Sequence, residues 1–482
     1  MHVKRFSIFL IMVALIVGMV GCSSGDPIYT LTIMTTAGGA VAVDNNLIIR
    51  GTAIITYNVT VGTVVSLNAT PDAGYFFVNW TGDVGTIGNV NTAATNITVN
   101  GNYTITAIFR ALKKIRDWYD LDAIRNNLRD HYILMNDLDA TTAGYEELAS
   151  PTSNEGKGWE PIGNSTSGNF AGTFDGQGYE IRDLFIIRPT ESNLGLFGCV
   201  NGTIENIGVA VNANLWGGGN PSVVGGLVGA NYGTVTNSYS TGSVAGYSDV
   251  GGLVGDNYGG TVSNCYFSGS VTGGNPVGGL VGGNFGGIVS YSHSSGSVSG
   301  HSFAGGLVGM NSVLSTVSNS YSTGSVTGIE VPLSGFLGGL VGYNCGTVSN
   351  SYSTGNVTGD EKVGGLVGCN CQCGIGNGPD FYGTVSDSYS TGSVSGNDLV
   401  GGLVGWNIGP VSDSFWDNET SGQATSGGGT GKTTAEMQNI TTFSGAPWNI
   451  TAVTNPSTRN LSYIWNIVDD VTYPFLSWQP VL

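Results

Sequence analysis

The sequence predicts an all-β protein in which a small N-terminal β domain precedes a three-sided parallel β-helix. Of its 482 residues 80 are Gly, without the three-residue period of collagen, and short runs of Gly, Ser, Thr, Asn and Val indicate many strands joined by tight turns. Self-similarity along the chain indicates a solenoid, whose units bury apolar surface by stacking on one another. The string GGLVG recurs seven times, beginning at Gly225, Gly251, Gly278, Gly305, Gly338, Gly364 and Gly401.

One repeat holds three apolar pulses, around Leu227, Val235 and Val244, separated by Gly, Asn or Ser turns. Three short strands per coil give a three-sided helix with coils about 4.8 Å apart. A leucine-rich repeat needs a longer Leu framework, and a propeller blade of about 40 residues needs four strands, so both fit less well. We assign the helix to residues 201–417, its first coils and a capping helix to 113–200, and a C-terminal cap to 418–482.

Residues 28–110 are predicted to form the separate β domain. Apolar and polar residues alternate through TYNVTVGTVVSLNATPDAGYFFVNWTGDV, and a last strand, YTITAIF, ends at Phe109. The pattern resembles the divergent InlB-type bacterial repeat, which implies a spacer domain and no chemistry. The residues that carry this resemblance are Gly62, Val65, Leu67, Ala69, Pro71, Gly74, Tyr75, Phe77, Trp80 and Gly82.

The two ends of the β-helix are predicted to be capped, because terminal coils have unpaired strand edges. At the start, Asp117 is placed to cap a helix in which Trp118, Leu121, Ile124 and Leu128 fall at helical spacing. At the far end the apolar residues expected to form the cap are Trp465, Ile467, Tyr473, Leu476 and Trp478.

The first 22 residues have the pattern of an export signal. Lys4 and Arg5 precede an apolar run that ends at Gly21 and Cys22. This end resembles a lipoprotein box, with Met19 where Leu is more common, which implies cleavage before Cys22 and a diacylglycerol anchor on its thiol. The alternative is ordinary secretion with Cys22 unmodified. No later stretch reaches the roughly 18 apolar residues of a membrane span, so we expect a lipoprotein anchored at the cell surface.

The charge pattern argues against nucleic acid and nucleotide partners. The net charge is -18, and residues 220–412 contain one Lys, Lys362, and no Arg, whereas phosphate binding needs clustered Lys and Arg. The segment SGGGTGKTT looks like a phosphate-binding loop, but Ser426 stands where its first Gly is required.

The repeats resemble the GLUG motif, named for its Gly-Leu-hydrophobic-Gly core, over roughly residues 115–480. GLUG repeats occur in bacterial and archaeal surface proteins, including adhesin-like proteins and the non-catalytic part of some immunoglobulin A peptidases. The resemblance implies a β-helical surface scaffold and names no reaction.

An Asn follows each GGLVG after one variable residue, which should point outward. Stacked at one corner, these amides are predicted to form a hydrogen-bonded ladder that holds the turns. The ladder residues are Asn231, Asn257, Asn284, Asn311, Asn344, Asn370 and Asn407.

Two further columns run through the repeats. One contains Asn237, Asn264, Tyr291, Asn319, Asn350, Asp387 and Asp413. Its last two carboxylates, one coil apart, are a candidate cation site for calcium, although Asp for Asn is also an ordinary exchange at an exposed turn. The other column is aromatic and either packs along the face or offers sugars a stacking surface: Tyr239, Tyr266, His293, Tyr321, Tyr352, Tyr389 and Phe415.

Four cysteines cluster in the later repeats. Cys345 and Cys371 follow the ladder Asn in successive coils, and a one-coil separation suits a disulfide in an exported protein, so this is the expected pair. The alternative is a soft-metal site in the C-x-C-x-C run of Cys369, Cys371 and Cys373, which lacks a nearby His. No structural metal is therefore assigned.

Catalytic signatures are absent from the sequence. There are four His and no HExxH, and the repeats lack the Arg and Lys bases of β-helix lyases. We therefore expect a non-catalytic surface lipoprotein that binds a surface glycan or protein as an adhesin or envelope scaffold. Two alternatives remain open: a polysaccharide hydrolase or lyase, for which Asp380, Asp387 and Asp413 would have to converge in a groove, and a purely structural stalk.

Overall fold

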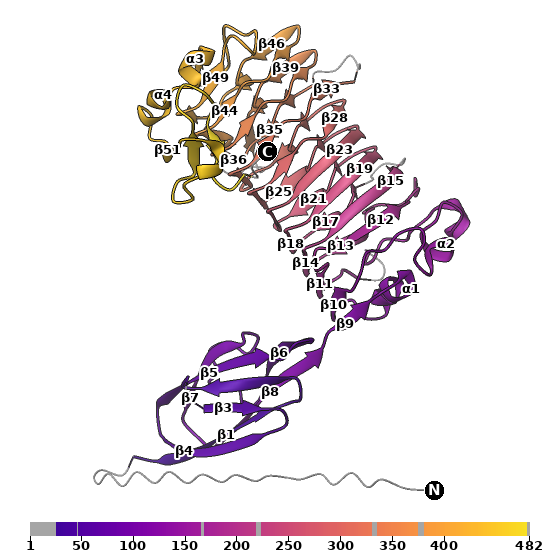
Figure 1. The fold of residues 1–482 in the computed structure, drawn as a ribbon, viewed down its shortest axis with the longest axis vertical. Coiled ribbons are helices and arrows are strands. Elements are labelled where there is room, and N and C mark those ends of the chain that lie inside the picture. Colours follow the sequence, from indigo (N-terminus) through magenta and orange to yellow (C-terminus); the bar gives the residue numbers. More distant parts are fainter. Residues whose placement is uncertain are drawn as a thin grey trace. The chain divides into compact units, whose positions relative to one another are not determined.

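The computed structural model describes residues 26–45, 47–164, 168–217, 223–329, 335–374 and 380–479. The chain divides into two compact units, Met1–Lys113 and Lys114–Leu482 (Figure 1). The predicted export signal and Cys22 lie outside the described residues. In the part of the chain that the structure describes, no helix is long and apolar enough to span a bilayer.

The N-terminal unit consists of two four-stranded sheets packed around one apolar core. Alternate residues of its strands point inward, and Leu31, Trp80 and Ile97 are almost fully buried. One sheet has the order β4 (Ile54–Thr60), β1 (Ile28–Thr35), β8 (Tyr103–Ala111), β6 (Tyr75–Gly82). The other has the order β3 (Leu47–Arg50), β2 (Gly39–Val43), β5 (Thr63–Pro71), β7 (Ala94–Val99).

The second unit is a parallel β-helix, so the predicted all-β fold is confirmed (Figure 1). One coil contains β16 (Val224–Gly225), β17 (Val228–Asn231), β18 (Thr234–Thr236) and β19 (Tyr239–Gly246). Each pairs in register with its equivalents in neighbouring coils, which gives four parallel sheets, numbered 1 to 4 in this order. Each coil has four strands, whereas the sequence predicted three from its three apolar pulses. The difference arises because the chain bends within GGLVG, so that this phrase contributes one strand to sheet 1 and one to sheet 2.

The strands of each sheet follow one another coil by coil. Sheet 1 continues with β20 (Val250–Gly251), β24 (Val277–Gly278), β29 (Ala304–Gly305), β34 (Leu337–Gly338), β39 (Glu361–Gly364) and β46 (Asp398–Gly401). Sheet 2 also contains β13 (Phe197–Val200), β21 (Val254–Tyr258), β25 (Val281–Phe285), β30 (Val308–Asn311), β35 (Val341–Asn344), β40 (Val367–Asn370) and β47 (Val404–Asn407).

Sheets 3 and 4 extend further toward both ends. Sheet 3 also contains β9 (Lys113–Ile115), β10 (His131–Leu134), β11 (Thr173–Asp175), β14 (Thr203–Glu205), β22 (Thr261–Ser263), β26 (Ile288–Ser290), β31 (Thr316–Ser318), β36 (Thr347–Ser349), β43 (Thr384–Ser386) and β48 (Val411–Ser412). Sheet 4 also contains β12 (Glu180–Leu184), β15 (Gly208–Gly217), β23 (Tyr266–Gly273), β27 (His293–Ser294), β28 (Ser297–Gly300), β32 (Tyr321–Ser322), β33 (Val326–Gly328), β37 (Tyr352–Ser353), β38 (Val357–Thr358), β44 (Tyr389–Ser390), β45 (Val394–Ser395), β49 (Phe415–Asp417) and β50 (Thr430–Lys432).

The GGLVG phrase is explained by the bend between sheets 1 and 2. Leu227 points into the core and is fully buried, as are its equivalents in the other coils. A side chain at Gly225 would collide with the carbonyl of Val228, and one at Gly226 with the Ser240 side chain across the core. The bend therefore requires Gly at both places, while each buried Leu or Val contributes about 1.5–3 kcal/mol.

Short helices close the N-terminal end of the β-helix. In α1 (Trp118–Asp122) the Asp117 side chain accepts a hydrogen bond from the Asp120 amide, and Trp118 is fully buried. The helix is shorter than the predicted one, because the chain tightens into η1 (Ala123–Asn126) before Leu128. Two further short segments follow, α2 (Tyr145–Leu148) and η2 (Asn154–Gly156).

The chain after the last coil first closes the end of the β-helix and then packs along its side. The apolar residues predicted to form the cap belong to the part that packs along the side. Residues 423–432 close the end: the Ser426 hydroxyl accepts hydrogen bonds from the amides of Leu403 and Val404, and β50 pairs with β49. The later segment instead packs against the outer face of sheet 4, where Trp465 contacts Tyr352 and Tyr389. We call residues 434–479 the tail; it contains α3 (Thr434–Met437), α4 (Ile440–Ser444), β51 (Ile450–Ala452), η3 (Pro456–Thr458), β52 (Trp465–Ile467) and β53 (Phe475–Leu476).

Candidate ligand-binding site

The Asn column lies inside the corner between sheets 2 and 3 and joins the coils. Each side-chain Nδ2 donates to the Oδ1 of the next Asn at 2.8–2.9 Å, from Asn231 through to Asn407. The first six side chains are fully buried. Because these amides are engaged with one another and with turn carbonyls, they hold the fold and offer nothing to a ligand.

The backbone conformation explains why Asn and Asp predominate in the column that ends in Asp387 and Asp413. All seven of its residues, from Asn237 to Asp413, have φ between 46° and 53°, the left-handed region that Asn and Asp tolerate best. Burial raises the pKa of Asp387, a hydrogen bond with Ser386 partly offsets this, and the charge of Asp413 adds a smaller rise. Asp380 lies apart from this corner, on the hairpin strand β42 (Asp380–Tyr382) that pairs with β41 (Gln372–Gly374). Among the described residues no three His, Cys, Asp or Glu side chains form a metal-binding group.

The expected Cys345–Cys371 disulfide is wrong. Cys345 is joined to Cys373, with their Cα atoms 5.9 Å apart, and Cys369 is joined to Cys371, with their Cα atoms 5.5 Å apart. The reason is the β41–β42 hairpin, which starts just after Cys371 and turns Cys373 back onto the preceding coil. With all four sulfurs bonded to one another, the C-x-C-x-C run has no free thiolate for a soft metal.

The aromatic column stands on the outer face of sheet 4 and is stacked from coil to coil. Consecutive ring centroids from Tyr239 to Tyr389 are 4.7–5.2 Å apart, with interplanar angles of 3–13°. The tail covers its later members, so that Tyr389 is 1% exposed. Tyr239 and Tyr266 lie beyond the tail, and His293 contacts only its end, at Trp478; all three rings are half-buried.

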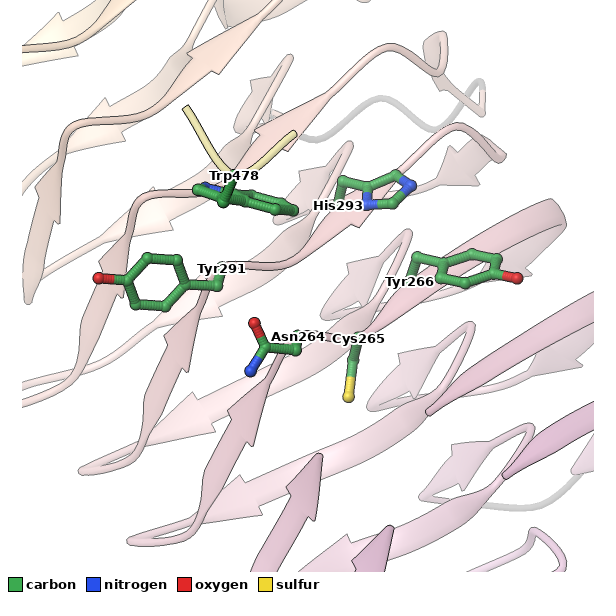
Figure 2. A pocket seen from close by; sticks show the side chains of 6 residues that line it. All are labelled: Asn264, Cys265, Tyr266, Tyr291, His293 and Trp478. Carbon is green, nitrogen blue, oxygen red and sulfur yellow. The ribbon is translucent and has the colours of Figure 1, made fainter. Parts of the chain in front are cut away.

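A pocket of about 170 Å³ lies where the covered and uncovered parts of this column meet. Figure 2 shows Trp478 of the tail on one side and Asn264 and Cys265 on the opposite side. The remaining walls are Tyr266, Tyr291 and His293. Trp478 packs edge-on against Tyr291, with centroids 6.1 Å apart, and at a tilt against His293. The volume is below the ~300–1,000 Å³ of drug-sized sites, which limits an occupant to about one ring.

The pocket is electrically neutral at physiological pH. Burial lowers the pKa of His293 to about 4 and raises the pKa of the Cys265 thiol to about 12. The imidazole is therefore uncharged and the thiol is protonated. Neither group suits proton abstraction or nucleophilic attack at neutral pH, since a general base works best near the ambient pH and the thiolate is the reactive form of Cys. The Trp478 indole N–H has no hydrogen-bond partner.

Two features of this site were not found from the sequence. A serine ladder runs beneath the aromatic column: the Ser292 hydroxyl donates to the Ser290 carbonyl and accepts from the amide of Cys265. Cys265 replaces one of these serines. The sequence could have predicted this ladder, because a Ser precedes almost every residue of the aromatic column. The contact of Trp478 with sheet 4 had no signal, because the tail does not repeat.

Comparison with known proteins identifies the repeat units and the N-terminal domain. Residues 29–113 match the divergent InlB B-repeat domain, and residues 220–245 and 246–272 each match the GLUG motif. Halomucin of Haloquadratum walsbyi is 36% identical over 142 residues, which are 28% of this chain and 2% of that protein. A protein named Gly-rich membrane protein of Evansella cellulosilytica is 36% identical over 121 residues, 24% of this chain and 13% of that protein. The chain thus spans a small share of the length of these relatives.

Solved structures with a similar arrangement share little sequence. One, described as an immunoglobulin A1 protease from Bacteroides ovatus, has a TM-score of 0.39 and 16% identity and covers 77% of this chain and 93% of its own. Another, an IgA1 protease, has a TM-score of 0.40 and 15% identity, covering 82% of this chain and 29% of its own.

Fold and sequence together define the class: a repeat protein whose parallel β-helix is built from one recurring phrase. In particular, the chain carries a divergent InlB B-repeat domain followed by GLUG motifs.

Proposed function

We propose that this protein is a non-catalytic cell-surface lipoprotein that binds an uncharged sugar residue in the pocket under Trp478, as an adhesin or envelope-binding scaffold. The observation that carries the proposal is the lining of the pocket, which is aromatic and neutral. The export signal and Cys22 supply the route to the surface and the membrane anchor. The name of the Evansella relative, a Gly-rich membrane protein, fits this location.

The chemistry of the pocket suits one face of a sugar ring. Sugars present C–H groups on their ring faces and hydroxyls around their edges, so they are recognised by aromatic rings with a few polar groups beside them. Here Trp478 and Tyr291 supply the rings, while the Asn264 amide supplies the hydrogen-bonding group. A charged ligand would find no counter-charge among the lining residues.

The proposal is tested by glycan binding of the mature chain, residues 23–482, on an array of neutral and acidic glycans. The key variant is Tyr291→Asn, because Asn264 and Asn319 occupy the same left-handed turn in the coils on either side. This change removes one wall of the pocket and fits the backbone, so we expect binding to fall at least tenfold while the melting temperature stays unchanged.

The matched control is Trp406→Ala, which removes an exposed aromatic residue on sheet 2, away from the pocket, and should leave binding intact. Binding that survives Tyr291→Asn would overturn the assignment of the site. Cleavage of any bound glycan would overturn the non-catalytic assignment.

A further inference from the structure

The two columns that border the pocket continue past it for one coil, on the side away from the tail. In the aromatic column, Tyr239 stacks on Tyr266 with ring centroids 4.7 Å apart and an interplanar angle of 8°. In the turn column, Asn237 and Asn264 adopt the same left-handed conformation, with φ of 49° and 53°, and both residues are exposed. We call the surface formed by these four residues the strip. It presents one amide group and one ring edge in each coil.

The tail closes the opposite end of the pocket. Trp478, which forms one wall (Figure 2), also contacts Tyr321 of the next coil, with ring centroids 5.8 Å apart. Tyr321 is 7% exposed, and Tyr352, one coil further, is 4% exposed. A linear molecule with one unit in the pocket therefore cannot continue across the later coils. Along the two columns it can extend only over the strip.

The strip itself ends after this one coil. In the preceding coil the ring position is Gly208, and the Tyr239 ring lies against its backbone, since a Cβ at Gly208 would be 2.4 Å from that ring. The turn position there is Asn206, whose amide donates a hydrogen bond of 3.0 Å to the Asp175 carboxylate. At the same end the Tyr239 hydroxyl donates to Glu180 at 3.3 Å. Coils are about 4.8 Å apart, close to the length of one sugar residue in an extended chain, so pocket and strip together hold about two residues.

We propose that the pocket and the strip bind the end of a linear, uncharged glycan, with its terminal residue under Trp478 and its second residue between Asn237 and Tyr239. This inference rests on the proposed function, because it requires a sugar in the pocket. A side-chain amide presents a donor and an acceptor side by side, which suits two neighbouring hydroxyls of one sugar ring. Stacked rings expose their edges, which carry the positive part of the ring quadrupole and attract sugar oxygens. The protein thus recognises chain ends and not the interior of a long polysaccharide.

The experiment is calorimetric titration of the mature chain, residues 23–482, with linear β-linked oligomers of glucose, mannose and N-acetylglucosamine, one to five residues long. We expect the disaccharide to bind at least tenfold more tightly than the monosaccharide. Every longer chain should bind within about twofold of the disaccharide, because the strip ends beside Glu180. Affinity that keeps rising with each added residue, or that does not rise from one residue to two, would contradict the proposal.

The selection of a chain end is tested by titrating the disaccharide in two blocked forms, one with a bulky group at its reducing end and one with the same group at its non-reducing end. The block should abolish binding at the end that enters the pocket. At the other end, which lies beyond the strip, it should change the affinity less than threefold. If both blocked forms bind, or if neither does, the pocket does not select a chain end and the proposal is wrong.

The strip is tested by Asn237→Gly, which removes the amide and suits the left-handed backbone. The ratio of disaccharide to monosaccharide affinity should fall from at least tenfold to less than threefold, with a melting temperature close to that of the wild type. The matched control is Asn350→Gly, at the same turn position in a coil that the tail covers, which should leave the ratio unchanged. An unchanged ratio in Asn237→Gly would refute the role of the strip.

The outcomes distinguish the strip from the pocket. If a monosaccharide binds and Tyr291→Asn abolishes this binding, but the disaccharide binds no more tightly, the sugar site stands and the strip is wrong. If none of the sugars binds to the wild type, the proposed function is wrong, and the strip with it.

Discussion

The covered and uncovered parts of the aromatic column have nearly the same sequence and different environments. Tyr266 and Tyr389 occupy equivalent positions, are stacked on their neighbours in the same way, and follow the same turn. Tyr389 is buried by the tail and its hydroxyl donates to the Pro474 carbonyl at 2.6 Å, whereas Tyr266 borders an open pocket. The repeat therefore sets the position of each ring, and a non-repeating segment decides which rings remain available to a ligand.

The largest expected effect comes from removing the tail's contact with the covered rings. Trp465 is fully buried against Tyr352 and Tyr389. Trp465→Ala leaves a cavity there, and large-to-small changes of this type cost about 3–5 kcal/mol. Chemical denaturation would measure the loss of unfolding free energy.

The control for this prediction is Trp406→Ala, which removes an exposed ring and should cost less than about 1 kcal/mol. Equal costs for the two variants would mean that the tail does not hold the covered half of the column.

The Asn ladder, at the corner between sheets 2 and 3, spans the coils of both parts of the column, so it tests whether the two parts differ only on the outside. Asn311→Ala removes two buried side-chain hydrogen bonds, the one that Asn311 accepts from Asn284 and the one that it donates to Asn344, so each neighbour keeps only its bond to the turn backbone. We expect a loss of about 2–3 kcal/mol of unfolding free energy. Asn407→Ala, at the half-buried end of the ladder, should cost less than half as much. A loss at Asn311 no larger than at Asn407 would show that the ladder is dispensable.

His293 gives the uncovered part a pH dependence that the covered tyrosines lack. Burial lowers its folded-state pKa to about 4, below the ordinary value of 6.5. The folded state therefore binds fewer protons than the unfolded state between these values, and stability is lost as the pH falls from 6.5 to 4. Allowing for solvent at this half-buried site, we expect a loss of about 2 kcal/mol.

The variant His293→Tyr restores the residue found on either side in the column, Tyr266 and Tyr321. Melting temperatures at pH 7 and pH 4.5 should show a smaller acid-induced decrease for this variant than for the wild type. The same decrease in both would assign the acid sensitivity to other groups.

What the sequence could predict depends on whether a residue belongs to the repeat. The Asn, turn and aromatic columns can be predicted from their fixed distance to GGLVG. Neighbouring coils pair in register, so residues at the same distance from GGLVG lie above one another. The paired cysteines do not follow, since Cys373 reaches Cys345 through a hairpin that interrupts the repeat. Trp478 escapes prediction for the same reason, because no interval relates it to Tyr291. The exposure expected of the variable residue after GGLVG is also wrong in several coils, since Ala230, Asp256 and Cys369 are buried.

The smallest expected effect concerns the turn column, which holds Asn in the earlier coils apart from Tyr291, and Asp in the last two. Left-handed backbone suits both residues, but Asp387 and Asp413 face each other across one coil, and burial and this like charge raise the pKa of Asp387. Asp387→Asn should therefore stabilise the protein at pH 7 by a few tenths of a kcal/mol, with little change at pH 3, where the carboxyls bind protons. Denaturation midpoints with and without 0.5 M NaCl would check this, since salt screens an exposed pair and should reduce the gain. A loss of stability at pH 7 would instead indicate that the Asp387 carboxylate binds a partner that Asn cannot bind. The calcium site predicted from the sequence at Asp387 and Asp413 would have this effect.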